Sequence, residues 1–396
     1  MNAQSGEKFI PLSIPYINGK EWQYVKECLD TGWVSSAGKY VELFEQQIAT
    51  YTGTGYAVSC VNGTSALQLA LRLAGVGPGD EVIVPTLTFI APVNAIAYNG
   101  ATPVFMDADK YYNIDTEKTI EFINKETVFK DGFTYNKLTN SRVIAIVPVH
   151  VFGNAAWMDE LIPLCEERNI SVVEDASESL GSVYKEGHYK GKHTGTLGKL
   201  GCLSFNGNKI ITTGGGGMIL TDDKKLAEKA RYLTTQAKDD PVRYIHHEIG
   251  YNFRLSNIQA ALGVAQLEQL SGFLERKKEI FQQYQTALND VDGLYIADVP
   301  DYADNNHWMN LLKINSEAYG EDREALMHRL EESVIQSRPV WALNHLQKPY
   351  RDCQSYKVEK ASELVEKSLC LPSSVGVSTV QLHGITDRLT NSACRS

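Results

Sequence analysis

Short apolar runs alternate with segments of helical periodicity from about Cys60 to Leu220, and this alternation restricts the possible folds more than any other feature of the chain. Strands separated by helices tend to pair in parallel, because a parallel pair needs a long crossover connection. Strands are predicted over 81–85, 102–107, 142–150, 171–175, 201–205 and 217–221. Helices are predicted over 65–73, 88–98, 157–168, 223–235 and 257–270. The predicted fold class is α/β, with a mainly parallel central sheet flanked by helices.

The pattern changes in the last third of the chain. Charge-rich helical segments, 276–288 and 321–333, surround isolated strands such as 311–314. This mixture is typical of an α+β domain. We predict a large α/β domain over residues 1–270 and a smaller C-terminal α+β domain over residues 271–396.

Charge and cysteine content narrow the classes of function. The formal net charge of −10 argues against a protein that coats nucleic acid, because phosphate backbones are bound through Lys and Arg. Seven cysteines are scattered without a CxxC pair, so neither a disulfide framework nor a metal site is predicted. The N-terminal MNAQSGEKFIPLS lacks the apolar core of a signal peptide, and no apolar run is long enough to span a bilayer. We expect a cytoplasmic protein that binds neither nucleic acid nor membrane.

The first predicted helix follows a turn-and-cap sequence, Asn62-Gly63-Thr64. The backbone N–H groups of Gly63, Thr64 and Ser65, two hydroxyls and the positive end of the helix dipole could together hold an anion. The same residues also suit an ordinary helix N-cap, and the segment alone leaves both interpretations open.

Asp175 stands at the end of an apolar strand, where a carboxylate is rarely buried without a partner. It could keep a pyridinium nitrogen protonated, which would make a pyridoxal phosphate (PLP) ring an electron sink. It could equally cap the following turn, bind a metal or act as a general base.

Lys209 lies between the predicted strand 201–205 and the glycine run 214–217. A lysine in so apolar a stretch suits imine chemistry with a carbonyl compound, although a lysine that extends its ammonium into solvent fits equally well. The glycines match neither GxGxxG nor GxxxxGK followed by Ser or Thr, and they precede a strand instead of opening a helix. Both the Rossmann and the P-loop interpretations are therefore rejected.

The order of these segments resembles the DegT-type nucleotide-sugar aminotransferases, a branch of the fold-type I PLP enzymes. The resemblance extends from about Ile10 through the C-terminal domain. The motifs that carry it are TGWVSSAGKYVELFE (31–45), NGTSAL (62–67), EDASESLG (174–181), SFNGNK (204–209) and GYNFRLS (250–256).

The resemblance implies a role for individual residues. Lys209 is expected to carry the cofactor, and Asp175 to face its ring nitrogen. Phe89 is expected to stack on the ring, and the hydroxyls of Thr64 and Ser204 to hold the phosphate. The cofactor-binding residues that we predict are Gly63, Thr64, Ser65, Phe89, Asp175, Glu178, Ser204, Lys209 and Asn252.

Glu178 departs from the family pattern. Many relatives have Gln or His three residues after the aspartate, near the ring hydroxyl, whereas this chain has a carboxylate. In that respect EDASESLG looks most like enzymes of the bacillosamine and legionaminic acid pathways. Asn252 resembles the residue that reaches the phosphate from the neighbouring subunit, which implies a homodimer with shared active sites.

These similarities imply transfer of an amino group from glutamate to C4 of a nucleotide-linked 4-keto-6-deoxy-N-acetylhexosamine. A C3 aminotransferase is the main alternative, and a non-catalytic PLP-fold regulator is a second. Cations are expected to hold the nucleotide diphosphate, and other side chains to line the sugar pocket. The candidate substrate-binding residues are Arg254, His307, Arg338 and His345, with Lys190, Lys192 and Trp308 as further candidates.

Overall fold

A mixed sheet organises the larger part of the chain in the computed structural model, which describes residues 9–240 and 242–390. Within these residues eight strands lie in the order β1-β10-β9-β7-β6-β2-β3-β15. Their bounds are β1 (Tyr56–Cys60), β2 (Glu81–Pro85), β3 (Thr102–Met106), β6 (Val143–Ile146), β7 (Ser171–Asp175), β9 (Leu200–Ser204), β10 (Gly217–Thr221) and β15 (Ser355–Tyr356). Part of the N-terminal segment considered above, residues 1–8, and Cys394 lie outside the described residues.

The sheet is mainly parallel, as the alternation of strands and helices predicted. Strand β10 is antiparallel to β1 and to β9, whereas the other neighbouring pairs run parallel. The carboxyl ends of the parallel strands therefore meet along one edge of the sheet, which is where open α/β sheets place their ligands.

Two hydrophobic cores lie against the two faces of this sheet. On β2, Ile83 packs into one core, and its neighbours Val82 and Val84 pack into the other, because successive strand side chains point to opposite faces. Helices α5 and α6 contribute to the first core, and α2, α3, α4, α7 and α8 contribute to the second. The helices of this part are α1 (Glu21–Thr31), α2 (Lys39–Thr52), α3 (Gly63–Leu73), α4 (Ala91–Tyr98), α5 (Thr116–Lys125), α6 (Leu161–Glu167), α7 (Lys224–Thr234) and α8 (Asn257–Leu267).

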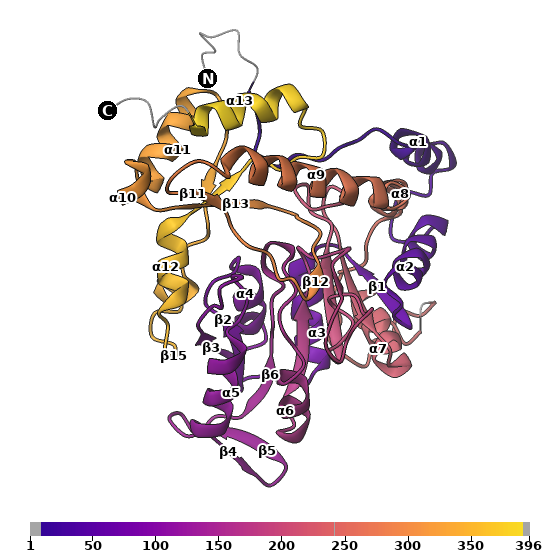
Figure 1. Cartoon of the computed structure of the whole chain (residues 1–396). Coiled ribbons are helices and arrows are strands. Elements are labelled where there is room, and N and C mark those ends of the chain that lie inside the picture. The colour runs from indigo at the N-terminus through magenta and orange to yellow at the C-terminus, as the bar shows by residue number, and fades with distance from the viewer. Residues whose placement is uncertain (1–8, 241, 391–396) are drawn as a thin grey trace.

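A second, smaller sheet has the order β11-β13-β16-β14 among the described residues and packs with helices of the C-terminal part around a third core (Figure 1). Its elements are β11 (Leu294–Ile296), β13 (Asn310–Ile314), β14 (Arg338–Pro339), β16 (Ser368–Leu371), α9 (Leu270–Leu288), α10 (Ser316–Tyr319), α11 (Arg323–Glu332), α12 (Lys360–Lys367) and α13 (Thr379–Thr390). Two short pairs complete the fold: β4 (Thr127–Lys130) with β5 (Phe133–Asn136), and β8 (Val183–Tyr184) with β12 (Ala303–Asp304).

The two parts exchange segments. Ile10 bridges Ile335 in the C-terminal part, and β15 adds a parallel strand to β3 at the edge of the large sheet. We call residues 338–359 the strap. This segment begins in the small sheet at β14 and pairs with the large sheet as β15; α12, which follows it, leads back to β16 in the small sheet. The division into two domains near residue 270 stays a prediction.

Three predicted boundaries differ from the structure, two of them because of a proline. The strand expected over 142–150 is regular only over β6, because Pro148 has no N–H to donate to a neighbouring strand. The helix expected over 157–168 begins only at Leu161, since Pro163 is tolerated in the first turn of a helix but not further in. The helix expected over 257–270 ends at Leu267, and a new helix, α9, begins at Leu270.

Candidate active site

A cavity of about 640 Å³ lies where the carboxyl ends of the parallel strands face the beginning of the strap. It brings together residues from segments far apart in the sequence, including the ends of β7 and β9, the start of α3 and the strap residues 338–342. Of the residues that we predicted, those that line this cavity are Gly63, Thr64, Phe89, Asp175, Glu178, Ser204, Lys209, Trp308 and Arg338.

The start of α3 is both a capped helix and a cavity wall. The side chain of Asn62 accepts a hydrogen bond of 2.8 Å from the backbone N–H of Ser65, so the cap interpretation holds for that residue. Gly63 and Thr64 face the cavity, and Ser65 is not among the lining residues. A Cβ on Gly63 would lie 2.9 Å from the Cβ of Ser204, so glycine allows Ser204 to approach the helix start closely. Exposed N–H groups and hydroxyls there suit a phosphate.

Lys209 points into the cavity. Its side chain is 14% exposed, and its Nζ lies 3.3 Å from Oε1 of Glu178. The ammonium also lies over the ring of Trp308, at 4.2 Å from the ring centroid, which is a favourable cation–π distance. The solvated-lysine alternative considered from the sequence therefore does not describe this side chain.

Asp175 ends β7 and is fully enclosed. Burial raises the pKa of its carboxyl group, and this shift is opposed by a hydrogen bond to Ser177 and by the charges of Lys209 and His150. The backbone N–H of Ser177 donates to Oδ1 over 3.0 Å. Asp175 therefore presents a poorly solvated carboxylate in the same cavity as the amine of Lys209. A cationic ring nitrogen would stabilise this carboxylate.

Glu178 is held at both oxygens. Oε1 contacts Lys209, and Oε2 accepts a hydrogen bond of 2.8 Å from the backbone N–H of Phe152. Burial raises the pKa of this carboxyl group, although the nearby Lys209 ammonium lowers it. Phe152 has a φ of 57°, a left-handed conformation that is costly for a residue with a side chain. This strain at the cavity wall aims the N–H of Phe152 at the carboxylate.

An aromatic wall, made of Phe89, Phe152, Trp308 and Trp341, lines the cavity. The ring of Phe152 is stacked on that of Trp341, with centroids 4.7 Å apart, and lies 6.2 Å from that of Trp308. The indole N–H of Trp308 donates to the carbonyl of Asn208, next to Lys209, over 2.7 Å. Phe152 was not predicted from the sequence. Gly153, after a predicted strand, indicates a turn there but does not show where the neighbouring phenylalanine ring points.

Arg338 is an exposed cation at the start of the strap, and it forms an ion pair with no carboxylate among the described residues. Trp308 also lines the cavity, whereas the remaining predicted substrate contacts do not. Arg254 pairs with the buried carboxylate of Glu45. His307 is stacked on Phe281, and burial lowers its pKa to about 4.

His345 lies on the strap, and its Nδ1 is 2.7 Å from the hydroxyl oxygen of Thr86. Burial lowers the pKa of His345. Lys190, Lys192 and Asn252 are exposed or half-buried and are also absent from the cavity lining. The substrate and partner roles predicted for these residues, as for Arg254 and His307, stay predictions.

The residues of the cavity fit PLP. An amine, a buried carboxylate and a helix start with hydroxyls face one space, and Oδ1 of the lining residue Asn208 is buried without a hydrogen-bond partner. The described residues contain no group of His, Cys, Asp or Glu arranged to hold a metal ion. Within the same residues, no helix combines the length and apolarity needed to cross a membrane.

Comparison with known proteins agrees with this geometry. The profile of the DegT/DnrJ/EryC1/StrS aminotransferase family matches residues 15–390, and the chain belongs to this family. A GDP-perosamine synthase of Escherichia coli O157:H7 is 39% identical, over 95% of this chain and 96% of that protein. A UDP-4-amino-4-deoxy-L-arabinose–oxoglutarate aminotransferase of Shewanella sediminis (strain HAW-EB3) is 32% identical, over 87% of this chain and 86% of that protein.

The solved structure of DesI with its TDP-sugar product superposes with a TM-score of 0.87 at 26% identity, and covers 98% of this chain and 94% of that one. The fold is accordingly that of the fold-type I PLP aminotransferases, as predicted. The protein is a PLP-dependent sugar aminotransferase, and its family supports a nucleotide sugar as the substrate.

Proposed function

We propose that the enzyme transfers the amino group of glutamate to C4 of a nucleotide-linked 4-keto-6-deoxy-N-acetylhexosamine. The observation that carries this proposal is the joint placement of Lys209, Asp175 and Glu178 in one cavity with an exposed cation, Arg338, at its strap side. Two similar enzymes are named for 4-amino sugars or for perosamine, which favours C4 over C3.

Each residue has a proposed task toward the cofactor. Lys209 would carry PLP, Asp175 would face the ring nitrogen and Phe89 the ring, while Gly63, Thr64 and Ser204 would hold the phosphate. Bound PLP supplies an electron sink for the bond that must break at the donor's α-carbon.

The side chains would then control charge and protons. Asp175, poorly solvated, holds a positive charge at the ring nitrogen, and Lys209 moves a proton at the donor's α-carbon. Glu178 would keep the Lys209 side chain inside the cavity, because its Oε1 lies 3.3 Å from Nζ. The buried rings of Phe152 and Trp308 would limit the access of water to these groups.

The acceptor would lie toward the strap. Arg338 is proposed to contact the diphosphate, with a planar guanidinium suited to phosphate oxygens. We also propose a homodimer in which Asn252, which is exposed in the single chain, reaches the phosphate of the second subunit.

The proposal is tested with purified protein and a panel of UDP- and GDP-linked 4-keto and 3-keto sugars. We expect a yellow protein whose visible band disappears with glutamate and returns with the 4-keto-6-deoxy-N-acetylhexosamine, and a product whose mass and NMR spectrum place the amine at C4. An amine at C3 would establish the alternative regiochemistry. A band that glutamate leaves unchanged would favour a non-catalytic role.

A further inference from the structure

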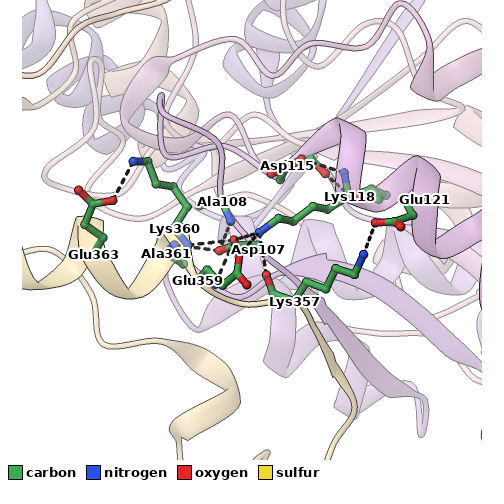
Figure 2. Close-up of polar contacts among 11 residues, drawn as sticks. Asp107, Ala108, Asp115, Lys118, Glu121, Lys357, Glu359, Lys360, Ala361 and Glu363 are labelled. Atoms are coloured by element: carbon green, nitrogen blue, oxygen red, sulfur yellow. Dashed lines mark hydrogen bonds and ion pairs between the residues drawn. The ribbon is translucent and has the colours of Figure 1, made fainter.

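A buried carboxylate outside the cavity joins the large sheet to the strap. Asp107 follows β3, has 0% exposure, and accepts five hydrogen bonds (Figure 2). The Nζ of Lys118 donates to Oδ2 over 2.6 Å. The other donors are the backbone N–H groups of Ala108 (2.8 Å), Glu359 (3.1 Å), Lys360 (3.0 Å) and Ala361 (2.8 Å).

Three of these donors belong to the start of α12. Glu359 occupies the N-cap position of this helix, but its own side chain makes no capping bond. Asp107 therefore caps α12 from a position 252 residues earlier in the chain. Burial would raise the pKa of Asp107, but the hydrogen bonds from Lys118 and from the start of α12 together lower it below the ordinary value. The carboxylate is thus held in its charged form by the segment that it caps.

Lys118 strengthens the same junction. Its Nζ also donates to the carbonyl of Lys357 over 2.8 Å and to Glu359 over 3.1 Å, so a single ammonium joins α5 to the end of the strap. Figure 2 shows Lys118 and Asp107 pointing toward one another between the two segments. Hydrogen bonds between charged groups are about twice as strong as neutral ones.

The other end of the strap forms part of the cavity. Arg338 and Trp341 line it, and Asn344 donates to the carbonyls of Thr86 and Thr88 over 3.1 and 2.7 Å. Between these contacts and α12 the strap meets the large part of the chain at Tyr350, whose hydroxyl donates to Oδ1 of Asn94 over 2.6 Å. It also does so at Gln354, whose Oε1 accepts from Asn136 over 2.6 Å, and through the two residues of β15. Figure 1 shows β15 and α12 beside β3, along the side of the large sheet.

We propose that Asp107 is a positioning residue for the sugar side of the cavity. By capping α12, it fixes the return of the strap to the small sheet, and so sets the position in which the strap presents Arg338 and Trp341. Asp107 touches neither cofactor nor substrate in this proposal. The expected change in KM rests on the function proposed above, whereas the positioning of the strap by Asp107 does not.

The test compares Asp107→Asn with the wild type as cofactor-loaded enzymes, by hydrogen exchange read by mass spectrometry. The asparagine side chain has no negative charge, and its NH₂ group would face the N–H donors of α12. Exchange of the backbone amide hydrogens should therefore accelerate about tenfold across the strap and the first turn of α12. Exchange in β7 and β9 should stay unchanged. With the nucleotide sugar, KM should rise while kcat and the loss of the visible band with glutamate stay close to wild type.

Glu121→Gln is the matched control. Glu121 forms an ion pair of 2.6 Å with Lys357 in the same junction, but this pair is partly exposed and caps no helix, so its loss should change neither exchange nor KM. If Asp107→Asn does not fold, Lys118→Gln is measured instead; it keeps the helix cap and should give a smaller acceleration in the same segment.

Exchange that is unchanged in the strap, or that accelerates equally over the whole chain, would overturn the proposal. So would an unaltered KM in a variant whose strap does exchange faster. Exchange is recorded without substrate. If the enzyme accepted no nucleotide sugar, the proposed function would be refuted, but the hydrogen-exchange result for the strap could still be interpreted.

Discussion

The two sides of the cavity are built in different ways. The cofactor side consists of residues that follow parallel strands or begin a helix, such as Asp175, Ser204 and Thr64. The proposed sugar side includes the strap, a segment with little regular structure that Asn344 joins to the end of β2. The residues proposed for the cofactor therefore lie on a rigid frame, whereas the neighbouring wall is a segment positioned by a few contacts.

This difference predicts how substitutions on each side will act. Changes on the cofactor side should abolish both half-reactions, because both use the same amine and ring. Substitutions on the strap should change KM for the nucleotide sugar more than KM for glutamate. Substitutions of buried residues that hold either side in place should lower the free energy of unfolding.

The largest effect is expected for Lys209→Ala. Without the amine, proton transfer at the donor's α-carbon should slow by at least about 10³-fold, and borohydride should no longer fix the cofactor to the protein. Steady-state transamination and mass spectrometry of the reduced protein measure both results. Lys199→Ala, which removes an exposed lysine, is the control. Near-normal turnover of Lys209→Ala would refute the mechanism.

Asp175→Asn should lower kcat in both half-reactions by roughly 10²–10³-fold, because the amide cannot stabilise a positive ring nitrogen. The visible spectrum of the bound cofactor should also change. Asp223→Asn offers a comparison at another strand end: Asp223 is exposed and caps α7, a task that Asn performs equally well. Equal losses in the two variants would show that Asp175 has only a structural role.

Arg338→Ala tests the sugar side. Loss of a charge-assisted contact to the diphosphate should raise KM for the nucleotide sugar about tenfold, with a smaller change in KM for glutamate. Arg351→Ala removes an exposed arginine of the same strap, and its kinetics should match the wild type. If Arg338→Ala impairs glutamate more than the sugar, the strap instead serves the donor.

The smallest effect concerns Lys277, a buried support of the sugar side. Its Nζ donates to the carbonyls of Trp308 and Ser373, and burial lowers its pKa to about 7 from the ordinary 10.5. Between these values the unfolded chain binds more protons than the folded one, so stability rises with pH. Relative to Lys277→Met, the wild type should gain about 1–2 kcal/mol from about pH 7 to about pH 9. Urea unfolding measures the difference, and parallel curves for the two proteins would contradict the prediction.

Much of the cofactor side could be predicted from the sequence. The start of α3, Asp175 and Lys209 were singled out from their positions in the sequence, each with an alternative role, and the resemblance added Ser204 and Phe89. The sugar side was predicted only in part. Arg338 lines the cavity, whereas His307 packs on Phe281 and His345 contacts Thr86, because tertiary packing and not sequence position decides where those rings point.

Glu178 illustrates the same limit at a single residue. The resemblance implied a place near the cofactor for its carboxylate, because many relatives have Gln or His at the corresponding position. Its two partners could not be predicted, since one of them, the N–H of Phe152, is aimed by a left-handed backbone conformation that the surrounding rings maintain.

The sequence by itself predicted the mainly parallel sheet, because the alternation of short apolar runs with helical segments is a local pattern, and its motifs resembled a family of PLP aminotransferases. Only the tertiary structure decided which segment closes the cavity. Strand β15 pairs with β3, and Asp107 caps a helix 252 residues away, and both contacts join segments whose local patterns are independent of one another. Such contacts form because buried donors and acceptors must find partners wherever the fold brings them.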